Sequence, residues 1–267
     1  MAVDPYRRLG TAFLHGRPAL ITYLMAGFPD RATSIASIRA AAEAGADLIE
    51  LGVPYADPLA DGPTIVDAAS VARGAEGGFG LAETLALAAE LTATAGMPPI
   101  ALMTYLNPML RYGLPRLAAD AAAAGIGGFI VPDLPPGNRM TEMWTAVAHP
   151  LGIDTVFLAA PTSTPERLRT VAEASSGFIY VVSSVGVTGE RGELPGGLPA
   201  LIERVREWRS NDCPVAVGFG VSTPEQAASV ARIADGVIVG SAIVKRQREP
   251  KAVSRFVASL AIAVHGA

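Results

Sequence analysis

The sequence predicts an α/β fold, a single-domain (β/α)8 TIM barrel with parallel strands and a few extra short helices, spanning residues 1–267. Half of the residues are hydrophobic and only 17% are charged, so the chain should bury a large core. Short apolar runs alternate about eight times with segments of helical spacing, as βα units do. Barrels of about 250 residues are routinely one domain, and no low-complexity linker marks a second one.

Eight strands are expected, because each of eight short runs is almost continuously apolar, as in parallel strands buried on both faces. In chain order they are Ala19–Leu24, Leu48–Gly52, Ile100–Thr104, Gly128–Val131, Thr155–Leu158, Phe178–Val182, Val215–Gly218 and Gly236–Val239. An open, doubly wound sheet should carry G-x-G-x-x-G after the first strand. Met25-Ala26-Gly27-Phe28-Pro29 stands there instead, which favours the closed barrel.

Helices are expected between the strands, where apolar residues recur with a helical period. The predicted helices are Arg31–Ala44, Leu81–Ala95, Leu114–Ala124, Thr141–Ala148, Pro165–Ala174, Pro199–Trp208, Pro224–Ile233 and Lys251–Val264. Thr164 and Thr223 each precede a proline at the first helical position, where a hydroxyl caps a free N–H and proline has none to lose. Extra helices should begin near Thr64 and Ser241.

Reactive side chains are scarce, which excludes several kinds of site. One cysteine, Cys213, excludes an intrachain disulfide or a thiolate cluster, and three scattered histidines leave little for a metal site. The net charge of −4 argues against nucleic-acid binding. The amino terminus lacks the pattern of a signal peptide, and no apolar run is long enough to span a membrane. We therefore expect a cytoplasmic protein without metal, nucleic acid or membrane partners.

Two carboxylates flank the carboxyl end of the second predicted strand, where active sites of such barrels lie. Glu50 interrupts an apolar strand, and burial would raise its pKa and suit it to proton transfer. A structural ion pair is an equally good reading of Glu50 alone. Asp61, in a proline-rich loop, could cap a helix, but together the two acids form a plausible acid/base pair. Asp133 follows the fourth strand and could contact a ligand or cap a turn.

The last two strands end in glycine-rich turns that suit a phosphate. Gly218-Phe219-Gly220 follows the seventh strand and Gly240-Ser241 the eighth, and glycines let backbone N–H groups approach an anion closely. Tight packing of helices on strands is the alternative reason for these glycines. The long, glycine-rich segment Val185–Gly197 is expected to be a lid over the site.

The positions of the lysines and the scarcity of histidines exclude several reaction types. Lys245 and Lys251, the two lysines, lie after the last strand, which excludes an imine-forming lysine inside the barrel. Few histidines surround the barrel mouth, which argues against a metal-dependent aldolase. Carboxylate-only acid/base chemistry on a phosphorylated substrate remains.

Several motifs together resemble the tryptophan synthase alpha chain family. The longest is LIELGVPYADPLADGPTI at 48–65, which contains both candidate carboxylates. Shorter matches follow in the family's order: MTYLNP at 103–108, VPDLP at 131–135, VGVTG at 185–189, GFG at 218–220 and VGSAIV at 239–244. The first motif is highly specific, whereas the glycine motifs alone would be weak.

The resemblance implies retro-aldol cleavage of indole-3-glycerol phosphate to indole and D-glyceraldehyde 3-phosphate, in the last steps of L-tryptophan biosynthesis, with no cofactor in this chain. Glu50 would be the general acid/base, Asp61 would hold the indole N–H, and Tyr180 would face the glycerol. Further substrate contacts would come from Tyr23, Met103, Tyr105, Asp133 and the lid residue Thr188. The phosphate would be bound by Gly189, Gly220, Gly240 and Ser241.

The resemblance also implies a partner, a beta chain that carries pyridoxal phosphate (PLP) and receives the indole in an α2β2 assembly. The contact region would include Asp57, Asn107 and Pro108. A stand-alone lyase without this partner is the main alternative. A different phosphosugar barrel would need acids at other strand ends, and a catalytically inactive scaffold is disfavoured by the presence of Glu50 and Asp61.

Overall fold

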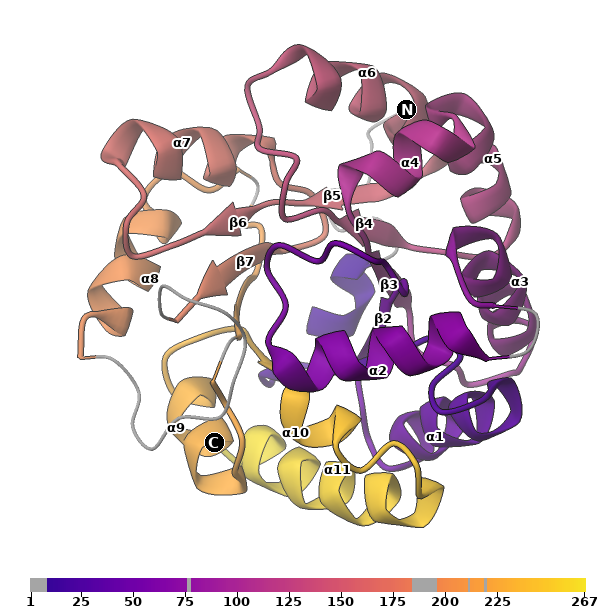
Figure 1. Ribbon diagram of the computed structural model, residues 1–267. Coiled ribbons are helices and arrows are strands. Elements are labelled where there is room, and N and C mark those ends of the chain that lie inside the picture. The colour runs from indigo at the N-terminus through magenta and orange to yellow at the C-terminus, as the bar shows by residue number, and fades with distance from the viewer. Residues whose placement is uncertain (1–8, 76–77, 184–195, 211, 219) are drawn as a thin grey trace.

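Parallel strands form one sheet that curves into a barrel, and helices surround it (Figure 1). The computed structural model describes residues 9–75, 78–183, 196–210, 212–218 and 220–267. Within these residues the hydrogen-bonded order of the strands is β5-β4-β3-β2-β1-β9-β8-β7-β6. The strands are β1 (Ala19–Met25), β2 (Leu48–Gly52), β3 (Ile100–Met103), β4 (Gly128–Ile130), β5 (Asp154–Val156), β6 (Leu158–Ala159), β7 (Ile179–Val182), β8 (Val215–Gly218) and β9 (Gly236–Val239).

The fifth predicted strand is two short strands, β5 and β6, separated by Phe157. Serine hydroxyls interrupt the backbone ladder here: Thr155 N–H donates to Ser176 Oγ at 2.9 Å and Phe157 N–H to Ser175 Oγ at 3.4 Å. Tyr180 N–H still donates to Phe157 O at 3.1 Å. Because β5 pairs with β4 and β6 pairs with β7, this one segment joins both ends of the sheet. The predicted barrel is confirmed.

The helices cover the outside of the barrel, and several predicted boundaries are confirmed. Thr164 and Thr223 accept hydrogen bonds from the backbone N–H three residues later, as expected of caps. The short helix predicted near Ser241 is present as α10. The helices are α1 (Arg31–Glu43), α2 (Pro63–Gly74), α3 (Leu81–Thr92), α4 (Leu106–Tyr112), α5 (Leu114–Ala123), α6 (Arg139–Ala148), α7 (Pro165–Ala174), α8 (Leu198–Arg206), α9 (Pro224–Ala231), α10 (Ser241–Val244) and α11 (Pro250–His265), with 3-10 turns η1 (Leu9–Phe13) and η2 (His149–Leu151).

Strand side chains alternate between two apolar cores. Ile49 and Leu51 of β2 point outward and pack under the helices, whereas Leu48 belongs to the cluster that fills the barrel. Period-two alternation therefore places Glu50 of β2 inside the barrel, on the same face as Leu48. Much of the excess hydrophobicity of the sequence is explained by this double burial.

The 3-10 turn η1 closes the amino-terminal end of the barrel. Leu9 is fully buried there, and its N–H donates to Asp154 Oδ2 at 3.1 Å. Gly128 and Gly177 allow the turn to approach the strands, because a Cβ at either position would lie 2.9 Å or less from atoms of Leu9. The opposite, carboxyl-terminal end carries the loops that bear the candidate site residues.

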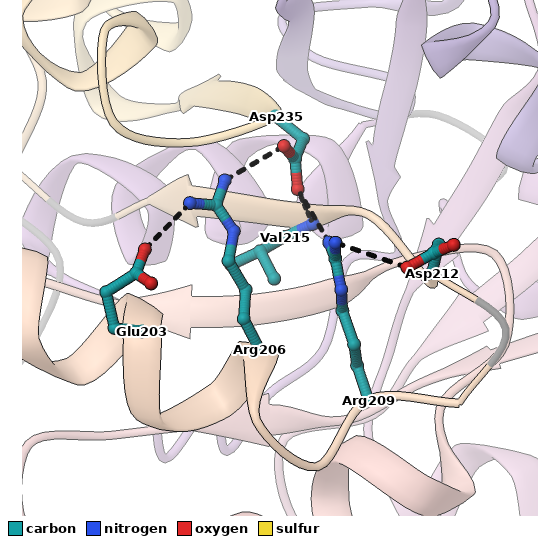
Figure 2. Close-up of polar contacts among 6 residues, drawn as sticks. All are labelled: Glu203, Arg206, Arg209, Asp212, Val215 and Asp235. Carbon is teal, nitrogen blue, oxygen red and sulfur yellow. Dashed lines mark hydrogen bonds and ion pairs between the residues drawn. The ribbon is translucent and has the colours of Figure 1, made fainter.

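Aspartates secure the strand starts at the closed end. Asp235 accepts the Val215 N–H at 2.8 Å and the Arg206 Nη2 at 2.9 Å, and Arg209 lies 3.5 Å away, as Figure 2 shows. Asp47 in the same way accepts the Leu20 N–H at 2.8 Å. Side chains at this end of a barrel serve stability rather than chemistry.

Asp47→Asn is expected to destabilise the fold by about 2 kcal/mol, the usual contribution of a hydrogen bond to a charged group. The Asp47 carboxylate is also bound by Arg17 at 2.9 and 3.0 Å and by His265 at 2.8 Å. Burial raises the pKa of Asp47, but the bonds from Arg17, Leu20 and His265 outweigh burial and hold the pKa below its usual 3.8. This contribution is therefore present at neutral pH and is lost as the pH falls through the lowered folded-state pKa.

Urea unfolding at pH 7 and at pH 3 measures the effect of Asp47→Asn. The difference in free energy between wild type and variant should shrink at the lower pH. An equal difference at both pH values would contradict a role for the charge.

Candidate active site

Glu50 lies deep in the barrel without a polar partner. Its side chain is 1% exposed, and neither carboxyl oxygen has a hydrogen-bond partner among the described residues. On the neighbouring strand it is in register with Tyr23. Burial, and next the charge of Asp61, raises the pKa of Glu50 to about 8. The ion pair considered from the sequence is therefore absent among these residues, and the carboxyl is largely protonated at neutral pH.

Asp61 lies in the loop between β2 and α2, near enough for its charge to act on Glu50. Its Oδ1 is buried and makes no hydrogen bond in the described part of the chain. Burial raises its pKa to about 6, although a hydrogen bond from Tyr105 lowers it in part. The Tyr105 hydroxyl also accepts the Ala60 N–H at 3.1 Å, which fixes the loop beside Asp61. At pH 7 Asp61 is mostly ionised while Glu50 is mostly protonated.

Tyrosine hydroxyls surround the two carboxyls. Burial raises the pKa of Tyr23 and Tyr180 well above 10, and the charges of Asp61 and Glu50 act in the same direction. Each hydroxyl occupies space that a glycine on the neighbouring strand leaves free: a Cβ at Gly52 would overlap the Tyr23 hydroxyl, and one at Gly218 the Tyr180 hydroxyl. These hydroxyls stay protonated and can donate hydrogen bonds at the site.

The wall beside the carboxyls is apolar. Met103, the last residue of β3, is 6% exposed and belongs to the cluster inside the barrel with Tyr23 and Tyr180. Phe28 and Ile65 belong to the same cluster. Phe28 and Ile65 were not predicted to lie at the site, because in the sequence they are single apolar residues in or just after connecting loops. The structure thus brings together Glu50, Asp61, Tyr23, Met103, Tyr105 and Tyr180.

The glycine turns lie side by side, because β8 and β9 are paired neighbours. Gly220 has a φ of +99°, a conformation that favours glycine. Gly240 caps α10, and Ser241 is the first residue of that helix. The other two residues expected at the phosphate and lid, Gly189 and Thr188, lie outside the described residues, as does most of the segment Val185–Gly197.

Asp133 makes a structural contact. Its Oδ1 accepts the Leu106 N–H at 2.9 Å and so holds the first turn of α4. The structure thus shows the capping contact that the sequence left open, and Asp133 adds a charge near the Tyr105 hydroxyl. Its proposed contact with substrate stays a prediction.

The surface beside the mouth exposes large apolar side chains. Leu59 is 72% exposed and Leu110 is 45% exposed. Asp57 is exposed on the same loop as Leu59, and Asn107 donates to the Tyr55 hydroxyl at 2.9 Å. A cavity of about 380 Å³ is lined by residues that include Tyr55, Pro108 and Tyr112. The exposed leucines were missed in the sequence, where nothing distinguishes them from core leucines.

Two other kinds of feature, a metal site and a membrane-spanning helix, are absent from the described residues. No group of three or more His, Cys, Asp or Glu side chains is placed to hold a metal ion. None of the helices described is long and apolar enough to cross a membrane. Cys213 is buried, and burial raises the pKa of its thiol to about 12.

Comparison with known proteins gives a consistent result. The family model for the tryptophan synthase alpha chain matches residues 11–264. The chain is 48% identical to the tryptophan synthase alpha chain of Mycobacterium avium (strain 104), over 85% of this chain and 81% of that one. For the Chloroflexus aurantiacus protein the identity is 47%, over 91% and 88%.

Solved structures agree with the sequence matches. A structure of Mycobacterium tuberculosis tryptophan synthase superposes with a TM-score of 0.88 at 43% identity and covers 97% of this chain and 98% of that one. The tryptophan synthase subunit alpha of Legionella pneumophila gives 0.86 at 29% identity, over 98% and 99%. The chain belongs to the tryptophan synthase alpha chain family, and it is a lyase that cleaves indole-3-glycerol phosphate in tryptophan biosynthesis.

Proposed function

We propose that Glu50 and Asp61 carry the cleavage as acid and charge stabiliser. The observation that supports this assignment is the separation of their pKa values, about 8 for Glu50 and about 6 for Asp61. At neutral pH one group is an acid and the other a carboxylate, although both are the same functional group. The barrel interior differentiates them by depth of burial.

In the proposed reaction Glu50 protonates C3 of the indole ring, and the ring nitrogen takes on positive charge. The Asp61 carboxylate accepts the N–H and stabilises that charge. The bond between C3 and the glycerol carbon then breaks, as the hydroxyl on that carbon returns its proton to Glu50 and becomes the aldehyde. Indole and D-glyceraldehyde 3-phosphate leave, and Glu50 is again protonated, so no cofactor in this chain is required.

The surroundings of the two acids suit the two halves of the substrate. Tyr23, Met103 and Tyr105 supply apolar surface for the indole ring, and the Tyr180 hydroxyl is available to the glycerol hydroxyls. We assign the phosphate to the backbone N–H groups around Gly220, Gly240 and Ser241, with Gly189 and the lid residue Thr188 completing the site. The phosphate then lies at the ends of β8 and β9, and the indole ring lies beside the ends of β1, β2 and β3.

We further propose that a PLP-dependent beta chain docks over the exposed surface at Asp57, Asn107 and Pro108. Leu59 on the loop of Asp57 and Leu110 on the helix of Asn107 and Pro108 are both exposed, and burial of such large apolar side chains by a partner would be favourable. Indole would pass directly to this partner. The alternative, a stand-alone lyase, is tested by adding a beta chain: a high cleavage rate that the partner does not change would favour the alternative.

The pH dependence of cleavage tests the acid/base assignment. We expect kcat/KM to rise with pH through about 6, as Asp61 ionises, and to fall through about 8, as Glu50 loses its proton. Because a substrate phosphate also titrates near 6, the same profile should be measured with indoleglycerol, which lacks the phosphate. A profile that has no limb near 8 with either substrate would contradict the assignment of Glu50.

A further inference from the structure

Gln247 is fully buried, and its side-chain amide bonds the last residue of β1 and the turn that follows it. Its Oε1 accepts the Met25 N–H at 2.9 Å, and its Nε2 donates to Met25 O at 2.7 Å and to Phe28 O at 3.0 Å. The backbone carbonyl of Gln247 accepts a hydrogen bond from the Ser37 hydroxyl of α1 at 2.7 Å. A buried amide is costly unless it is paired, so these bonds tie the chain around residue 247 firmly to β1.

The side chain of Gln247 takes the place of a missing strand neighbour. The pairing of β1 with β9 ends at Thr22 and Val239, whereas β1 continues beside β2 to Met25. Ala26 N–H donates to Gly52 O on the β2 side, and hydrogen-bonding groups alternate sides along a strand. Met25 therefore faces the side that β9 has left, and the Gln247 amide bonds both its N–H and its C=O.

The segment that Gln247 anchors leads from the predicted phosphate turn. Gly240 and Ser241 begin α10, and successive turns follow it, with Gln247 N–H donating to Val244 O at 3.1 Å. Helix α10 packs against β1 and against α2, beside which it lies in Figure 1. Helix α2 begins at Pro63, two residues after Asp61. The contact between α10 and α2 thus joins the helix that follows the predicted phosphate turn to the helix that follows the Asp61 loop.

We propose that Gln247 is a positioning residue for the cleavage reaction. By fixing α10 to the end of β1, it sets the distance between the Gly240–Ser241 turn and the Glu50–Asp61 pair. A substrate with its phosphate at one end and its reacting carbon at the other requires a constant span. Gln247 touches neither end and acts through the backbone, and this inference rests on the phosphate assignment proposed above.

The test compares indole-3-glycerol phosphate with indoleglycerol in the full-length chain. The ratio of the two kcat/KM values measures how much the phosphate contributes to catalysis. Gln247→Met keeps the size of the side chain but removes its hydrogen bonds, and the ratio should fall about tenfold, the effect of weakening one hydrogen bond to a charged group. The loss should lie mainly in KM for the phosphorylated substrate.

A merely structural role for Gln247 predicts a different result. Loss of folded enzyme lowers both kcat/KM values equally and leaves the ratio unchanged. Asp47→Asn, which weakens the opposite end of the barrel, is the matched control and should keep the wild-type ratio. If Gln247→Met does not fold, Ser37→Ala removes only the bond to the Gln247 carbonyl, and its ratio should fall about threefold.

An unchanged ratio in the folded Gln247 variant, or in Ser37→Ala if Gln247→Met does not fold, would overturn the positioning role. Failure of the phosphate assignment is a separate outcome, which Gly240→Ala tests at the turn itself: a Cβ there would meet protein atoms only at 3.6 Å or more, so a wild-type ratio in that variant would mean that the phosphate binds elsewhere.

Discussion

Glu50→Gln is expected to lower kcat for indole-3-glycerol phosphate cleavage by about a thousandfold, within the range for loss of a general acid/base. Glutamine has nearly the shape of the protonated carboxyl but has no proton that it can transfer to carbon. KM should change little, because the Glu50 carboxyl is buried at the bottom of the site and the phosphate and indole contacts remain. Single-turnover assays of purified wild type and variant at pH 7 measure the effect.

Stability provides the control for Glu50→Gln. Because the folded-state pKa of Glu50 is raised to about 8 from 4.5, its ionisation opposes folding increasingly as the pH rises between these values. The variant lacks this penalty and should be at least as stable as wild type at pH 8. A stable variant that retains near wild-type cleavage would contradict the mechanism.

Asp61→Asn is expected to lower kcat by about a hundredfold, as does removal of one group that stabilises transition-state charge. The asparagine oxygen can still accept the indole N–H, so substrate binding should persist, but the negative charge opposite the cationic ring is lost. Steady-state assays should show this loss largely in kcat. In the indoleglycerol profile, the limb near pH 6 should also disappear.

Asp57→Asn is the matched control for Asp61→Asn. Asp57 lies on the same loop and is exposed, so its substitution should leave cleavage by the chain alone unchanged. Equal effects of the two substitutions would mean that the loop, rather than the Asp61 charge, matters for the rate.

Strand positions were largely predictable because an apolar run bounded by glycine or proline leaves few alternatives. The predicted Val215–Gly218 and Gly236–Val239 have the observed bounds of β8 and β9, and Pro165–Ala174 has those of α7. The prediction of one continuous fifth strand was wrong. Hydroxyls of Ser175 and Ser176, distant in the sequence, accept backbone N–H groups that would otherwise bond to a neighbouring strand. Such contacts have no local pattern.

Helix α4 was not among the predicted helices, because Asn107 and Pro108 were assigned only to the contact region with the partner. Proline is tolerated in the first turn of a helix, where N–H groups lack intrahelical partners, and Pro108 is the third residue of α4. Asp133, from the next strand end, bonds the Leu106 N–H and secures that start.

The acids of the candidate site were visible from the sequence, but their different pKa values were not. Glu50 in an apolar strand and Asp61 in the following loop could be identified as a pair without coordinates. How deeply each is buried depends on the closure of the barrel, and the contact of Tyr105 with the Asp61 loop joins segments far apart in the chain. Gln247 resembled any polar residue near a helix, and only its pairing with Met25 distinguishes it.

The η1 turn affects how substrate can enter the barrel and how indole can leave it. Because the buried Leu9 packs against the strand starts at the amino-terminal end, we expect substrate to enter and indole to leave through the mouth at the carboxyl-terminal end. A protein that covers this mouth must supply an exit of its own or block turnover. For the proposed beta chain, docking beside Leu59 would therefore determine the route of the indole as well as hold the complex together.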